Sequence, residues 1–73
     1  MILVSQDKMT MTPFNGSTVK VESCGLEMVE IRANGWTMAV YGTKKGVCNA
    51  VCDMIDAVLK GAEEFQFPEE VTE

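Results

Sequence analysis

The sequence contains no histidine. Histidine is the side chain most often used as a general acid or base near neutral pH, and it is the commonest zinc ligand. Its absence excludes serine–histidine and cysteine–histidine catalysis within one chain. We therefore expect a protein that is not an enzyme, with no catalytic residues and no metal ion or cofactor.

Long apolar runs are also missing, since no stretch approaches the ~18–20 residues that span a bilayer. The first residues, Met1 to Ser5, lack the basic lead-in and long apolar stretch of a signal peptide. The three cysteines are an odd number, so an oxidising compartment would leave at least one of them unpaired. We expect a cytoplasmic protein with free, buried thiols and no membrane partner.

Basic residues are absent from the last thirteen positions, which contain five glutamates. Residues 1–60 carry six acidic and six basic side chains, so the whole formal charge of −5 lies in residues 61–73. A nucleic-acid binder needs a basic surface that displaces counterions from phosphates. The sequence therefore predicts one domain over residues 1–61, an acidic C-terminal tail over residues 62–73, and no nucleic-acid partner.

Turn signals recur along the first half of the chain, at Gln6-Asp7, Asn15-Gly16, Cys24-Gly25 and Asn34-Gly35. The stretches between them are rich in Val, Ile, Thr and Met, which is typical of antiparallel strands. After Tyr41-Gly42 the apolar period changes from 2 to 3.6. The predicted fold is α+β: a five-stranded antiparallel meander sheet with one C-terminal helix packed on one face.

Each turn predicts a register. A two-residue type I′ turn at Asn34-Gly35 sets Ala33 opposite Trp36 and Ile31 opposite Met38. The other loops are expected to set these side chains opposite each other: Val4 and Met9, Met11 and Val21, Val21 and Val29, Lys20 and Glu30. The resulting apolar face consists of Ile2, Val4, Met9, Met11, Val19, Val21, Val29, Ile31, Trp36, Met38 and Val40.

The helix is expected to begin after Thr43 as N-cap and to end at Gly61 as C′ residue. Its apolar stripe, facing the sheet, is predicted from the 3.6-residue period as Val47, Val51, Met54, Ile55, Val58 and Leu59. In the tail, the alternation Phe65-Gln66-Phe67 fits a short last strand over Glu64–Phe67 that covers a sheet edge. A frayed acidic tail is the alternative, and the sequence leaves both open.

The sheet face away from the helix is predicted to present apolar side chains among polar ones. The residues expected there are Leu3, Phe14, Met28, Ala39 and Tyr41. Mixed surface of this kind is a candidate interface. We expect it to bind a protein partner or a second copy of the chain.

The cysteines suggest an alternative function. Cys48 and Cys52 lie one helical turn apart and, with Cys24, can supply thiolate ligands to a soft metal. Zinc cysteines usually occur in paired C-x2-C knuckles, which this sequence lacks. The main hypothesis is thus a non-enzymatic interaction or accessory protein, and the alternative is a small thiol or soft-metal-binding protein.

Three further stretches are informative together: ILVSQDK at residues 2–8, the passage from Tyr41-Gly42-Thr43 into the helix, and FQFPEE at residues 65–70. They resemble small proteins encoded in phages and prophages of Gram-positive bacteria. The middle of the chain shares only strand alternation with that family, and Gly46-Val47-Cys48 departs from its charged, alanine-rich helix start. The resemblance implies a phage or prophage origin but no mechanism, because the family has no established activity.

Overall fold

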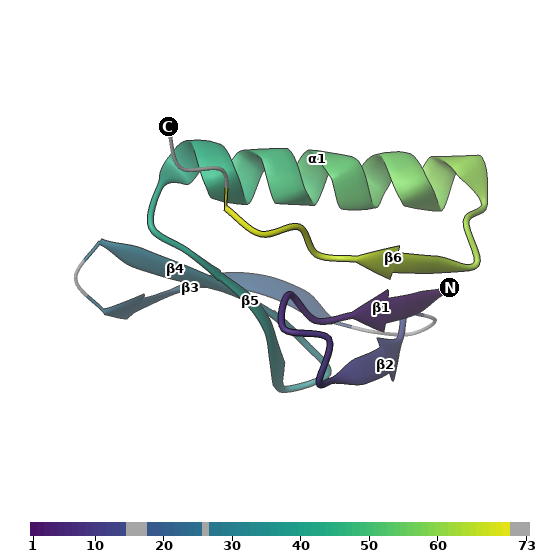
Figure 1. Cartoon of the computed structure of the whole chain (residues 1–73), viewed down its shortest axis with the longest axis horizontal. Coiled ribbons are helices and arrows are strands. Elements are labelled where there is room, and N and C mark those ends of the chain that lie inside the picture. The colour runs from purple at the N-terminus through teal and green to yellow at the C-terminus, as the bar shows by residue number, and fades with distance from the viewer. Residues whose placement is uncertain (15–17, 26, 71–73) are drawn as a thin grey trace.

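In the computed structural model, which describes residues 1–14, 18–25 and 27–70, six strands and one helix form an α+β fold (Figure 1). The elements are β1 (Ile2–Val4), β2 (Met11–Pro13), β3 (Val19–Gly25), β4 (Met28–Ala33), β5 (Trp36–Tyr41), α1 (Lys44–Lys60) and β6 (Glu64–Gln66). No helix within the described ranges is long and apolar enough to cross a membrane.

The strands form two sheets of three, so the prediction of one five-stranded meander is wrong. The meander sheet has the order β3-β4-β5 and is antiparallel throughout. In the small sheet, of order β2-β1-β6, β1 is antiparallel to β2 and parallel to β6. The predicted pairing of Met11 with Val21 is therefore absent; its turn at residues 15–17 lies outside the described residues. Helix α1 packs against β4, β5 and β6, and so spans both sheets (Figure 1).

The loop between β1 and β2 is longer than predicted. Val4 pairs with Met11 instead of Met9. The intervening turn is closed by hydrogen bonds from Ser5 N to Thr10 O (2.8 Å) and from Met9 N to Asp7 Oδ1 (2.9 Å). Ser5 Oγ also donates to Asp7. The hydrogen bonds from Ser5 Oγ and Met9 N lower the pKa of the Asp7 carboxyl. This polar turn sets a register two residues away from the predicted one.

The buried face of β1 and β2 is also opposite to the predicted one. Leu3 and Thr12 are buried, whereas Ile2, Met9 and Met11 are exposed. Leu3 pairs with Thr12 on one side and with Phe65 of β6 on the other, so these three side chains share one face. β1 pairs with β6 and not with the meander sheet. The side of β1 that points inward is therefore the side that contacts the core, with Leu3 on it.

The Asn34-Gly35 hairpin is confirmed, with φ of 54° and 84° and with Ala33 opposite Trp36. A register shift then follows, since Arg32 pairs with Thr37 but Ile31 pairs with Ala39. Met38 is the extra residue of this bulge. One inserted residue reverses the facing of all that follow it in a strand. The bulge thus places Ala39 and Tyr41 in the core, and Trp36 is 61% exposed.

The register between β3 and β4 differs from the prediction by two residues. Val21 pairs with Ile31 instead of Val29, so the predicted facing of Lys20 and Glu30 is wrong. Lys20 lies opposite Arg32, and Glu22 lies opposite Glu30. A two-residue change keeps every side chain on its predicted face. Val19 and Val21 therefore still share a face with Ile31.

Both predicted ends of the helix are confirmed. The Thr43 side chain accepts a hydrogen bond from Gly46 N (3.0 Å), and Gly61 adopts the left-handed conformation with φ of 72°. The buried helix residues are Val47, Ala50 and Met54, with Val51 half-buried. The predicted stripe is too broad, because Ile55, Val58 and Leu59 are 49%, 39% and 81% exposed.

The end of the described chain is ordered against the rest of the molecule. The predicted short last strand is present as β6, which pairs with β1. Phe67 is fully buried, and its ring meets that of Phe65 edge to face at a centroid distance of 5.1 Å. Residues that the sequence assigns to a tail therefore contribute to the core, with Leu3, Ile31, Met38 and Tyr41 among its other members.

Candidate functional site

The five residues predicted to form an interface do not share a surface. Leu3, Ala39 and Tyr41 have at most 2% of their surface exposed and belong to the core. Phe14 is half-buried against that core, and Met28 is 41% exposed. The predicted placement is wrong because β1 turns Leu3 inward and the bulge at Met38 turns Ala39 and Tyr41 inward.

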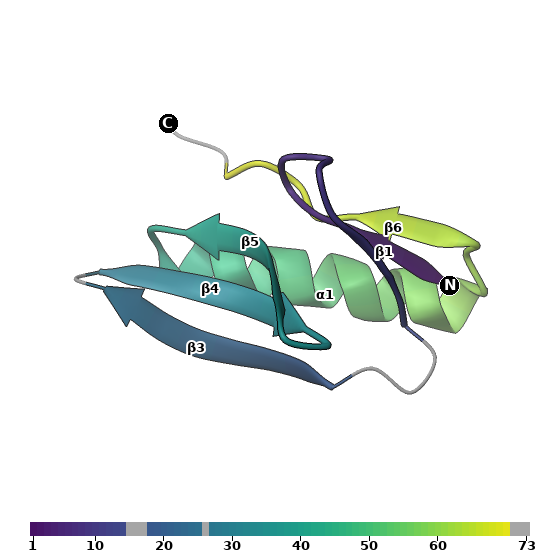
Figure 2. The same cartoon turned by 90° about the horizontal axis from the view of Figure 1, so that it is seen from below.

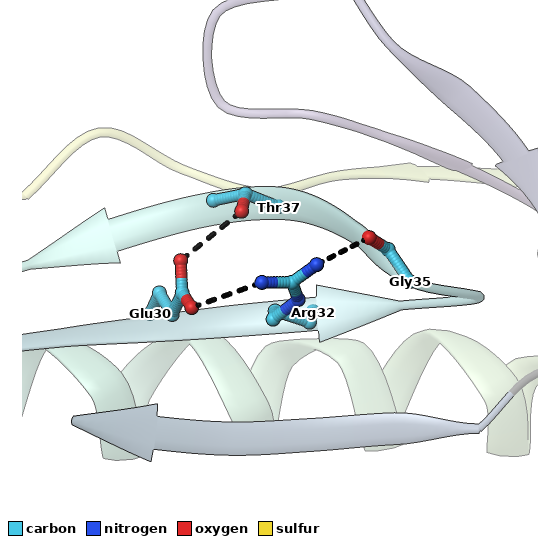
Figure 3. A network of polar contacts seen from close by, with 4 residues as sticks. All are labelled: Glu30, Arg32, Gly35 and Thr37. Carbon is cyan, nitrogen blue, oxygen red and sulfur yellow. Dashed lines mark hydrogen bonds and ion pairs between the residues drawn. The ribbon is translucent and has the colours of Figure 1, made fainter. Parts of the chain in front are cut away.

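The face of the meander sheet away from α1 is instead polar. Arg32 Nη1 lies 3.5 Å from Glu30 Oε1, and Arg32 Nη2 donates to the carbonyl of Gly35 (Figure 3). Thr37 Oγ1 donates to Glu30 Oε2 at 3.0 Å. Lys20 and Glu22 lie on this same face, opposite Arg32 and Glu30. Such a surface offers charges for recognition but little apolar area to bury.

Apolar side chains of both α1 and β3 remain exposed. We call this surface the open flank and define it as Val21, Ile55, Val58 and Leu59. Val21 is 50% exposed, although it lies on the core face of β3. On the same two elements, half-buried Val19 and Val51 pack against the core.

The open flank exists because the helix does not cover β3. Figure 2 shows β6 and β3 on opposite sides of the molecule, with α1 between them. One side of α1, including Gly46, Asn49 and Asp53, lies toward residues 68–70. Helical spacing therefore places Ile55 and Val58 on the other side, toward β3. One apolar side of α1 and the core face of β3 are thus each partly exposed.

Beside the open flank runs the outer edge of β3. The meander sheet has the order β3-β4-β5, and no strand among the described residues pairs with this edge of β3. The other edge, along β5, is covered by Gln6: its N–H donates to Met38 O (2.7 Å), and its Oε1 accepts from Val40 N (3.2 Å). An uncovered strand edge presents backbone donors and acceptors to a partner.

A second feature, at the beginning of α1, is a hollow of about 610 Å³ bounded by the helix and by residues 68–70. Glu70 accepts hydrogen bonds there from Gly42 N (3.0 Å), Thr43 N (3.1 Å) and Thr43 Oγ1 (2.9 Å). The positive end of a helix dipole favours a carboxylate at this position. These hydrogen bonds lower the pKa of the Glu70 carboxyl.

Tyr41 connects the core to the same C-terminal segment. Its hydroxyl donates to Pro68 O at 2.6 Å, and Gln6 Nε2 donates to the same carbonyl at 3.2 Å. Burial, with the charges of Glu70 and Asp53 nearby, raises the pKa of Tyr41 to about 12. The groups best suited to bind a ligand are therefore already engaged within the chain, and their role here is to hold residues 68–70.

The thiols are not buried as predicted, since Cys48 and Cys52 are both exposed on α1. The side chain of Cys24 lies outside the described part of the structure. In the regions that the structure describes, no three His, Cys, Asp or Glu side chains lie close enough together to hold a metal ion.

Sequence reasoning missed both the open flank and the docking of Glu70. The open flank could have been suspected from the breadth of the apolar stripe on the helix, which exceeds what one face can bury. Glu70 gave no such signal, because its partners lie far away in the sequence. Comparisons with protein-family models, curated proteins and solved structures give no match. The function is therefore inferred from the chain's own surfaces.

Proposed function

We propose that this protein is a small, non-enzymatic interaction or accessory protein that binds a protein partner through the open flank and the adjoining edge of β3. The observation that carries the proposal is the uncovered edge of β3, together with the exposure of Val21 on that strand and of Ile55 and Val58 on α1. This surface replaces the sheet face predicted from the sequence.

Physical considerations favour a macromolecular partner. Burying a fully exposed Val, Leu or Ile side chain contributes about 1.5–3 kcal/mol, and the open flank has four such side chains in part exposed. Contiguous apolar surface next to polar residues marks interaction sites on soluble proteins. Backbone pairing along β3 adds directional hydrogen bonds to this apolar contact.

The test compares immobilised wild-type protein with the flank variant I55K/V58K and with M9K, which changes a side chain that is 83% exposed elsewhere. Proteins retained from a Gram-positive bacterial lysate are identified and then titrated in purified form. We expect wild type and M9K to bind the same partner, and I55K/V58K to lose it. Equal binding by all three, or no binding together with no self-association, would contradict the proposal.

The origin and setting of the protein belong to the same proposal. The resemblance of residues 2–8 and 65–70 to small phage and prophage proteins supports a phage or prophage origin. The distribution of charge supports a partner other than nucleic acid, and we place the protein in the cytoplasm because its cysteine number is odd.

A thiol or soft-metal function through Cys24, Cys48 and Cys52 is the second candidate. The exposure of Cys48 and Cys52, one turn apart on α1, favours it. Thiol titration of the folded protein with elemental analysis separates the two candidates. A stoichiometric metal that disappears in C48S/C52S would favour the second.

A further inference from the structure

We propose that the partner is a second copy of the chain, and that two copies pair edge to edge through β3, antiparallel, about a two-fold axis at Val21. This inference rests on the proposed function and names its partner. It joins two meander sheets into one continuous six-stranded sheet.

The hydrogen-bonding phase of β3 suits this pairing. Asn34 N donates to Thr18 O at 3.2 Å, and the same register continues along the strands through Lys20 with Arg32 and Glu22 with Glu30. In an antiparallel ladder, hydrogen-bonded pairs alternate with non-hydrogen-bonded pairs. Val19, Val21 and Ser23 therefore turn their N–H and C=O groups toward the outer edge. Val21 can then exchange two hydrogen bonds with the Val21 of a second copy.

The charges beside Val21 specify the register. Antiparallel pairing centred on Val21 sets Lys20 of each copy opposite Glu22 of the other. Within one chain, Lys20 lies opposite Arg32 and Glu22 opposite Glu30, so like charges face each other across β3 and β4. Among the described residues, neither Lys20 nor Glu22 has an ion-pair partner. In the dimer, the basic pair of one copy (Lys20 and Arg32) lies beside the acidic pair of the other copy (Glu22 and Glu30). The two-fold axis produces this arrangement twice.

The apolar side chains of β3 lie on the other face of the joined strands, opposite to Lys20 and Glu22. Val19 and Val21 are on the face of β3 that looks toward the helix layer, and the open flank of α1 lies on the β3 side. The two-fold axis therefore turns the open flanks of both copies toward each other above the joined strands. Pairing of the two edges would shelter Val21, which is 50% exposed in the single chain.

β3 also lacks most of the features that normally protect a strand edge. It has seven residues, is the longest strand among the described elements, and contains no proline. Its one register shift lies between Ser23 and Gly25, at the end of the segment that pairs around Val21. Lysine on an edge strand usually discourages pairing. Here the opposing position in the second copy is an acid, so Lys20 would discourage other registers and favour this one.

The charge-reversal variants K20E and E22K test the register directly. In either variant alone, both cross-copy pairs become like-charged, and we expect self-association to weaken by about tenfold or more. In an equimolar mixture, each cross-copy pair again joins an acid with a base. We expect the mixture to recover the dissociation constant of wild type, measured by sedimentation equilibrium.

Neither K20E nor E22K is expected to unfold the protein. K20E places an acid opposite Arg32, and E22K places a base opposite Glu30, so each change relieves a like-charge pair within the chain. Both variants should therefore unfold at urea concentrations equal to or above that of wild type when measured at concentrations where all are monomeric.

Three results would overturn the inference: a monomeric wild type at its highest soluble concentration, a dimer unaffected by either charge reversal, or weakened variants that the mixture does not restore. A monomeric wild type that still binds another protein through Ile55 and Val58 would overturn the homodimer and leave the proposed function standing. A dimer lost in I55K/V58K but insensitive to both charge reversals would show flank-to-flank association without β3 pairing.

Discussion

Glu70 shows how one side chain fixes the C-terminal segment to the beginning of α1. Its carboxylate accepts hydrogen bonds from two backbone N–H groups and one hydroxyl, from Gly42 and Thr43. Gly46 makes this approach available, because a Cβ at that position would lie 2.5 Å from Glu70 Oε2. A side chain at this position, in the first turn of α1, would force the Glu70 carboxylate to shift.

The lowered pKa of Glu70 predicts a stability contribution that depends on pH. Since the folded-state pKa lies below its ordinary value of 4.5, the contribution is fully present above that pH and is lost as the pH falls further. We expect E70Q to unfold at lower urea concentration than wild type near neutral pH. The difference should shrink as the pH falls below 4.5 and the Glu70 carboxyl becomes protonated, because both side chains are then uncharged.

The control for this experiment is E69Q, which changes the exposed neighbouring glutamate. Asp7 also has a lowered pKa, so every variant loses some stability in acid, and only the difference between the E69Q and E70Q curves reports on Glu70. A difference that stays constant from neutral to acid pH would refute the electrostatic role.

At the scale of elements, the end of α1 depends on a glycine in the left-handed conformation. Gly61 has φ of +72°, and a Cβ there would meet nothing within 4 Å. G61A should therefore destabilise the protein through backbone conformation alone, by about 1–2 kcal/mol. Urea denaturation measures this loss.

Gly25 provides the matched position, since a Cβ there also meets nothing and its φ is not in the left-handed region. We expect G25A to change the free energy of unfolding by less than about 0.5 kcal/mol. Equal effects of the two substitutions would show that the helix end tolerates an ordinary residue.

Features set by neighbouring residues were predictable from the sequence. Thr43 and Gly61 as helix ends, and the Asn34-Gly35 turn, each depend on local conformation and local hydrogen bonds. The apolar face of β4 was also predicted correctly, because Val29, Ile31 and Ala33 follow simple alternation. These features need no knowledge of what lies across the fold.

Features set by distant partners were not predictable. No residue in β5 signals the bulge at Met38, yet the bulge moves Ala39 and Tyr41 from a predicted surface into the core. The inward facing of Leu3 depends on β6, which pairs with β1 from the far end of the chain. The predicted interface was wrong for these two reasons, and the open flank emerged only when the area covered by α1 was known.

At the scale of the whole molecule, residues 64–70 of the acidic C-terminal segment are part of the fold. Phe67 is fully buried, and its backbone N–H donates to Val4 O at 3.0 Å. F67A removes a buried aromatic side chain and should cost about 3–5 kcal/mol. A domain of this length has a total stability of only about 4–11 kcal/mol, so a large unfolded fraction is expected.

Circular dichroism during thermal unfolding measures this effect, with W36A as the control. Trp36 is also a large aromatic residue, but it is 61% exposed, so its removal should lower the melting temperature far less. If F67A and W36A melt alike, the C-terminal segment is not part of the cooperative unit.

The parallel pairing of β1 with β6 has a consequence for the growing chain. β1 begins at residue 2 and β6 begins at residue 64, so translation at ~5–20 residues per second separates their synthesis by about 3–12 s. During that interval β1 has β2 as a neighbour but lacks β6, and Leu3 lacks the covering provided by residues 64–67. The order of synthesis thus leaves β1 without one of its two neighbours during this interval, and folding of the small sheet is completed only after residues 64–66 have been made.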